Sequence, residues 1–142
     1  MIHFFEEDVT FVPRNKLRLR KWITQVIQSF QCKPGEINFI FCTDEYLHRV
    51  NVDYLAHDYY TDIITFDQSE QDDKVEGDIY ISIDRVRDNA TTLGVPFESE
   101  LHRVLIHGIL HLLGHDDHSD EDRQIMRAAE NTALETLKTL AS

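Results

Sequence analysis

The most apolar stretch of the chain is Val104–Leu113, where only His107, Gly108 and His111 interrupt a run of aliphatic side chains. A helix that is apolar on nearly every side belongs in an interior, because only burial removes that surface from water. The run is too short to cross a bilayer, so the interior is that of the protein itself. Gly114 follows and predicts the end of the helix, since glycine readily adopts the left-handed conformation that turns the chain.

The rest of the chain alternates between two shorter patterns. Runs rich in β-branched and aromatic residues predict four strands, at Ile2–Phe5, Ile37–Cys42, Ile63–Phe66 and Ile79–Ile83. Apolar residues at helical spacing and capping residues predict further helices, from Pro13 to Phe30, from Thr43 to about Tyr54, from Asp84 to near Gly94, and from Ser119 onward. We expect the acidic segment Asp67–Asp78 to be a hairpin-like loop.

These elements predict an α+β fold, in which a small mixed four-stranded sheet packs with about five helices around the buried histidine-bearing helix. A chain of 142 residues is the right size for one domain, spanning residues 1–142. The opening residues lack the basic and apolar segments of a signal peptide, and no run approaches the ~20 apolar residues of a membrane helix. Cys32 and Cys42 are well separated, as in proteins with reduced thiols. We therefore expect a cytoplasmic protein that does not associate with membranes.

His107 and His111 are four residues apart, so their side chains leave one face of the helix. Both imidazoles can then reach one ion, as in the H-E-x-x-H helices of zinc proteins. A lone histidine on an apolar helix is more often a core residue bonded to a carbonyl, but this pair precedes a glycine turn and the ligand-type residues H-D-D-H at 115–118. Structural zinc sites usually recruit several cysteines, so this pattern favours a zinc ion with an open position for water.

Three segments resemble the YbeY family, the bacterial endoribonucleases that act in rRNA maturation. H-G-I-L-H-L-L-G-H-D-D-H at 107–118 is similar to the family signature H-G-x-L-H-L-x-G-Y-D-H. T-D-I-I-T-F at 61–66 and G-D-I-Y-I-S at 77–82 match two further family segments, and Asn51 falls on the asparagine of the family's L-N segment. The resemblance implies the same α+β fold and a zinc-dependent, single-strand-specific endoribonuclease of rRNA maturation and ribosome quality control.

The third metal ligand departs from the family pattern. The family spacing H-x3-H-x5-H implies a ligand ten residues after His107, which is Asp117 here, whereas His118 lies one place later. A carboxylate is a competent zinc ligand, and Asp117 keeps the spacing from the glycine turn. We therefore favour one Zn²⁺ held by His107, His111 and Asp117, with His118 as the alternative if the loop accommodates an extra residue.

A second departure concerns catalysis. The family places an arginine four residues after the L-N asparagine, where it is thought to assist phosphodiester cleavage, and this chain has Leu55 there. The developing phosphorane charge must then be stabilised from elsewhere, for which His57 is one candidate. Neither His115 nor Asp116 can be ranked as a general base, so no catalytic residue is assigned.

The negative charge of the chain restricts how it can bind RNA. With a net charge of −12 and a pI near 4.9, it cannot hold nucleic acid by bulk electrostatics, and we expect no DNA binding. Arg14–Lys21 is the one dense basic stretch, either a solvated face or a phosphate contact. We expect the partners to be an rRNA precursor and the small ribosomal subunit or its proteins, with weak, salt-sensitive binding to free RNA.

Two other functions are considered. A zinc protease needs a glutamate directly after the first histidine as its general base, and Gly108 stands there, which makes this function unfavourable. A ribosome-assembly factor with a structural metal and vestigial hydrolysis fits the missing arginine.

Overall fold

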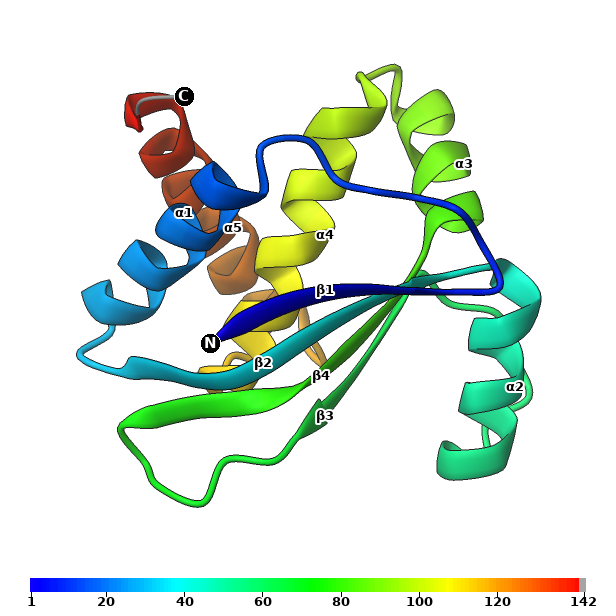
Figure 1. Ribbon diagram of the computed structural model, residues 1–142, viewed down its shortest axis with the longest axis horizontal. Helices are drawn as coiled ribbons and strands as arrows, with labels where there is room; N and C mark the ends of the chain where they lie inside the picture. Colours follow the sequence, from blue (N-terminus) through cyan, green and yellow to red (C-terminus); the bar gives the residue numbers. More distant parts are fainter. Residues whose placement is uncertain (141–142) are drawn as a thin grey trace.

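The structure is a computed structural model that describes residues 1–140. In this range the chain forms, in order, β1 (Ile2–Glu7), α1 (Lys16–Ser29), β2 (Lys33–Cys42), α2 (Asp44–Leu55), β3 (Ile63–Asp67), β4 (Lys74–Ser82), α3 (Ile83–Leu93), α4 (Phe97–Leu112) and α5 (Asp120–Thr139) (Figure 1). The strands form one sheet in the order β1-β2-β4-β3, in which β3 is antiparallel to β4 and the other pairs are parallel. The expected α+β fold with a small mixed sheet is confirmed.

The helices divide unequally between the two faces of the sheet (Figure 1). α1 and α4 pack on one face, and α5 lies against both of them. The fully buried Trp22 of α1 fixes this layer, because its indole N–H donates to the carbonyl oxygen of Ala133 on α5 at 2.7 Å. α2 packs on the other face over β3 and β4, where Leu47 and Val50 form a small second core with Ile64. None of the helices within residues 1–140 combines the length and the apolar character needed to cross a membrane.

α4 is the helix around which the main core forms, as the apolar pattern predicts. Gly108 lies where α4 approaches the sheet most closely: a Cβ atom there would lie 2.9 Å from Cγ2 of Ile79 on β4 and 3.0 Å from Cδ1 of Ile63 on β3. Glycine suits this approach, since a side chain would require Ile79, Ile63 or the helix to shift. Gly114 follows with φ of 102°, the left-handed conformation expected at the end of the helix. The histidine face of α4 is thereby held at a fixed depth.

The predicted loop at Asp67–Asp78 is partly wrong, because β4 already begins at Lys74. Val75, Gly77, Ile79 and Ile81 are buried, whereas the charged residues that alternate with them, Lys74, Glu76 and Asp78, are partly exposed. Charged residues on the partly exposed face of β4 therefore gave the segment the composition of a loop.

Two helix starts also differ from the prediction. Ser82, rather than Asp84, caps α3, because its hydroxyl oxygen accepts a hydrogen bond from the backbone N–H of Arg85 at 3.1 Å. α1 begins at Lys16 and not at Pro13. The predicted cap of α5 is confirmed, since the Ser119 hydroxyl accepts from the third backbone N–H of that helix.

Candidate metal centre

His107 and His111 extend from α4 toward the carboxylate of Asp117, which lies in the loop before α5. The two Nε2 atoms are 3.0 Å apart. Oδ2 of Asp117 lies 3.5 Å from Nε2 of His107 and 3.7 Å from Nε2 of His111. The structure thus brings together the three residues that the spacing singled out, with one donor atom of each within 4.8 Å of the others.

The dimensions of this triangle fit one zinc-sized ion. Donor atoms about 2.0–2.1 Å from a tetrahedral zinc are separated from one another by roughly 3.3 Å. The three observed separations, from 3.0 to 3.7 Å, scatter around that value. Imidazole nitrogen and carboxylate oxygen are both ordinary zinc donors, and three protein donors leave a fourth position open. Within residues 1–140, no other group of histidine, cysteine or acidic side chains is arranged in this way.

His118 lies outside the triangle, and its residue is exposed. The loop is tied to α5 by Arg123, whose Nη1 donates to the carbonyl oxygens of Asp117 at 3.2 Å and of His118 at 3.4 Å. These bonds hold the loop in the conformation that directs Asp117 toward α4. The geometry therefore favours Asp117 over His118 as the third ligand.

Glu130 on α5 orients His107. Its Oε2 accepts from Nδ1 of His107 at 2.6 Å, and its Oε1 accepts from Nη1 of Arg103 at 2.7 Å. Metal-binding histidines commonly donate their second ring N–H to a carboxylate, which fixes the ring and leaves the other nitrogen for the ion. Glu130 does this from a buried position, so Nε2 of His107 is left for a metal.

Sequence reasoning missed Glu130 because α5 carries many acidic residues. One signal could have found it: Glu130 repeats in phase with Met126, Ala133 and Leu137, the buried residues of this helix. An ionisable residue on the buried face of an amphipathic helix needs a partner, which makes it a candidate for a role in a site.

The charges of the site follow from these contacts. Burial would lower the pKa of His107, but the hydrogen bond and charge of Glu130 outweigh it and raise that pKa above its ordinary value. Burial would likewise raise the pKa of Glu130, but His107 and Arg103 hold it below its ordinary value. For His111, burial and the neighbouring His107 both lower the pKa, so this ring favours the neutral form that binds metals. Burial raises the pKa of Asp62, at the start of β3, although His107 opposes the shift.

A cleft of about 560 Å³ opens beside the metal triangle. His107, Asp117 and Glu130 form one part of its wall, and α5 supplies the remaining residues, Asp120, Arg123, Gln124, Met126 and Arg127. The candidate metal position is therefore open to a ligand from solvent.

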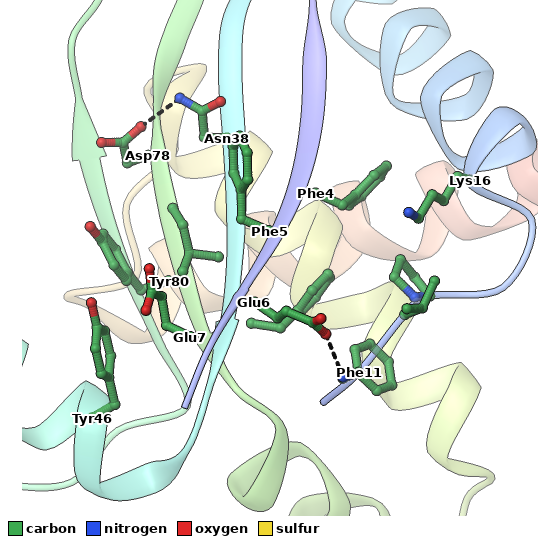
Figure 2. A pocket seen from close by; sticks show the side chains of 14 residues that line it. Phe4, Phe5, Glu6, Glu7, Phe11, Lys16, Asn38, Tyr46, Asp78 and Tyr80 are labelled. Atoms are coloured by element: carbon green, nitrogen blue, oxygen red, sulfur yellow. Dashed lines mark hydrogen bonds between the residues drawn. The ribbon is translucent and has the colours of Figure 1, made fainter. Parts of the chain in front are cut away.

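A second hollow lies at the β1 edge of the sheet, where Phe5, Tyr46 and Tyr80 contribute aromatic surface (Figure 2). Carboxylates at Glu6, Glu7 and Asp78 also line it, against one basic residue, Lys16. Phosphates would be repelled there, so this hollow does not suit a nucleic-acid backbone. The metal cleft is the better place for phosphodiester chemistry.

Known proteins resemble this chain along nearly its whole length. The family model described as Endoribonuclease YbeY matches residues 3–138 of the chain. The chain belongs to the YbeY family. An endoribonuclease YbeY of Cytophaga hutchinsonii is 48% identical over 137 residues, covering 96% of each chain. One of Porphyromonas gingivalis is 51% identical over 138 residues, covering 96% of this chain and 90% of the relative. A solution structure of a Thermotoga maritima protein shares the fold with a TM-score of 0.68 at 27% identity, covering 96% of this chain and 89% of that one.

Two features of this YbeY family member bear on catalysis. Leu55 ends α2 where the family arginine is expected, and His57, the candidate substitute, hydrogen-bonds Tyr59 and does not line the metal cleft. The structure therefore does not bring His57 to the metal cleft, and its role as a substitute stays a prediction.

Two of the five basic residues in the Arg14–Lys21 stretch of this YbeY family member are bonded within the fold. Arg18 donates from Nη2 to the carbonyl oxygen of Leu137 at 2.7 Å, and Arg20 donates from Nε to that of Ile2 at 2.9 Å. Both guanidinium groups thus hold the helical layer to its neighbours. This observation favours a structural role for these arginines over a phosphate contact.

Proposed function

We propose that this protein is a zinc-dependent endoribonuclease that cleaves single-stranded RNA during rRNA maturation and ribosome quality control. The observation that carries the proposal is the triangle of His107, His111 and Asp117, whose donor separations match a zinc ion and of which His107 and Asp117 line an open cleft. Membership of a family whose model is described as an endoribonuclease supports the RNA substrate and the hydrolytic reaction. We propose His107, His111 and Asp117 as the ligands of one Zn²⁺.

The protein side chains would each have a distinct task in the reaction. Glu130 holds the ring of His107 and keeps its Nε2 directed at the ion, while Arg123 keeps the Asp117 loop in place. The apolar body of α4 excludes water from the rear of the site, which strengthens the electrostatic interactions inside it. When bound, zinc would polarise the scissile phosphate and lower the pKa of a water toward ~7. Two neutral histidines and one carboxylate leave a net charge of +1 at the ion, which still attracts a phosphate.

We also propose that the RNA is an rRNA precursor that is presented by the small ribosomal subunit or its proteins in the cytoplasm. The net charge of −12 supports this, since a free RNA would gain little from long-range attraction. Binding to RNA that is already held by a basic partner avoids this difficulty.

One alternative retains support from a specific observation. Because Leu55 supplies no guanidinium, the metal could serve a ribosome-assembly factor whose hydrolysis is vestigial. A zinc protease is disfavoured, because Gly108 takes the place of the general base and faces the sheet rather than the cleft.

The test is cleavage by the purified protein of a single-stranded RNA and of the same RNA annealed to its complement. We expect zinc-dependent cleavage of the single strand only, lost on chelation and in His111→Ala. Cleavage that persists in His111→Ala would mean that the activity lies elsewhere or belongs to a contaminant. A protein that binds zinc stoichiometrically but cleaves neither RNA would favour the assembly-factor alternative.

A further inference from the structure

The metal cleft contains two guanidinium groups, both from α5, and they differ in what they contact. Arg123 donates to two loop carbonyls and pairs with the carboxylate of Asp120. Among residues 1–140, Arg127 makes one long contact, 3.6 Å from its Nη1 to Oε1 of Glu130, which is beyond hydrogen-bond range. That oxygen already accepts from Arg103 at 2.7 Å. Within the described part of the chain the N–H donors of Arg127 are therefore unused, and its side chain is 59% exposed.

Arg127 is also close to the metal triangle, because it and His107 both face the carboxylate of Glu130. Glu130 binds His107 with Oε2 and faces Arg127 with Oε1, so a single side chain separates the guanidinium from a proposed ligand. Both Arg127 and His107 line the same cleft. A phosphate placed beside the metal donors would thus lie in the same cavity as this guanidinium.

The negative charge of the cleft and of the whole chain favours such a cation for phosphate binding. Three carboxylates line the cleft, from Asp117, Asp120 and Glu130, in a chain with a net charge of −12. Leu55 supplies no guanidinium, and Arg18 and Arg20 are bonded to backbone carbonyls. A planar guanidinium can form two parallel hydrogen bonds to a phosphate, which also fixes its orientation.

We infer that Arg127 binds a phosphate group of the RNA in the metal cleft. This inference rests on the proposed function and assigns to α5 the phosphate contact that is missing at Leu55. A purely structural Arg127 would act through Glu130 on metal affinity and folding, whereas a phosphate contact acts on RNA binding and its dependence on salt.

The experiment uses the full-length, zinc-loaded protein with the substitutions Arg127→Gln and Arg127→Lys. Arg87→Gln is the matched control. It removes the same charge, and Arg87 is exposed on α3 and lies outside the cleft. Cleavage of a single-stranded RNA, anisotropy of the same RNA with a fluorescent label, bound zinc and Tm are measured for each protein.

For Arg127→Gln we expect KM and the Kd for RNA to rise about tenfold, with zinc content and Tm unchanged. The slope of log affinity against log salt should become shallower by about 0.7, the value for one phosphate contact on a single strand. Arg127→Lys should recover part of the loss, and Arg87→Gln should match the wild type.

Wild-type KM, Kd and salt slope in Arg127→Gln would overturn the inference and leave the proposed function intact. Loss of zinc from Arg127→Gln would also overturn it, because that result assigns the residue a structural role through Glu130. RNA binding that depends on Arg127 in a protein that cleaves nothing would support the phosphate contact and reject the nuclease. A wild-type protein that neither binds nor cleaves RNA would reject both.

Discussion

α4 and α5 form the metal centre together, but they contribute residues of opposite kinds. α4 is largely buried, and on the side that faces α5 it contributes the two histidines and Arg103, which donates to Glu130 and Asn131. α5 is largely exposed, and it contributes the charged groups Glu130, Arg123 and Arg127. The comparison separates two tasks: packing of α4 sets where the donor atoms lie, and hydrogen bonds from α5 set their orientation and charge. Changes in the ligands should therefore abolish metal binding, whereas a change in Glu130 of α5, which holds the ring of His107, should weaken it by degrees.

The largest effect is expected at the third ligand. Asp117→Ala should reduce zinc affinity at least ~100-fold and abolish RNA cleavage, because only two donors remain. His118→Ala, one residue later in the same loop, should retain full zinc content. Elemental analysis of both purified variants checks this, and zinc loss in His118→Ala with retention in Asp117→Ala would reverse the assignment.

A smaller loss is expected at Glu130, the residue of α5 that orients His107. Glu130→Gln preserves the shape of the side chain but removes the charge, so zinc affinity should fall about 10–100-fold. The control is Glu135→Gln, which removes a carboxylate from an exposed pair with Lys138 on the same helix. Competition with a coloured zinc chelator measures the affinity. Equal affinities in the two variants would show that α5 does not orient the ligand.

Gly108→Ala tests the packing role of α4. The added Cβ would lie 2.9 Å from Ile79, and such overpacking costs about 1–3 kcal/mol. Alanine stabilises a helix by about 1 kcal/mol relative to glycine, which offsets part of this cost. We therefore expect the free energy of unfolding to fall by roughly 1 kcal/mol. Urea denaturation checks this. A gain in stability, as at an open helical position, would mean that α4 is not held this closely to the sheet.

The pH dependence of the metal-free protein gives the smallest signal. The pKa of Glu130 is lowered from 4.5, so its contribution to stability is present above that pH and lost as the pH falls through the folded value. The pKa of His107 is raised from 6.5, so its contribution is present below that pH and lost as the pH rises through the folded value. The stability difference between wild type and Glu130→Gln should therefore be largest between about pH 4.5 and 6.5. Urea denaturation in chelator at pH 3.5, 5.5 and 8 checks this, and a constant difference would contradict the pairing.

The same two helices explain what the sequence could predict. His107 and His111 are conspicuous because they interrupt an apolar run, and the spacing to Asp117 follows from the glycine turn that ends α4. The apolar strands predicted the sheet, apart from the starts of β2 and β4. β2 begins at Lys33 rather than Ile37, and charged residues concealed the alternation at the start of β4.

Glu130 and Arg127 are less conspicuous. Both lie on a helix rich in charged residues, where the helical spacing of Glu130 from the buried residues is the one local signal and Arg127 has none. Their roles depend on the packing of α5 against α4, which brings residues 23 positions apart into contact at His107 and Glu130. Only the tertiary structure supplies that contact.

The most direct test of the proposed zinc site is X-ray absorption spectroscopy of the zinc-loaded protein, compared between wild type and Asp117→Ala. We expect one zinc per chain with two imidazole ligands, one carboxylate oxygen and one oxygen that is not supplied by the protein. The variant should lose the bound zinc. A shell that contains three imidazoles, or one completed entirely by protein atoms, would contradict it.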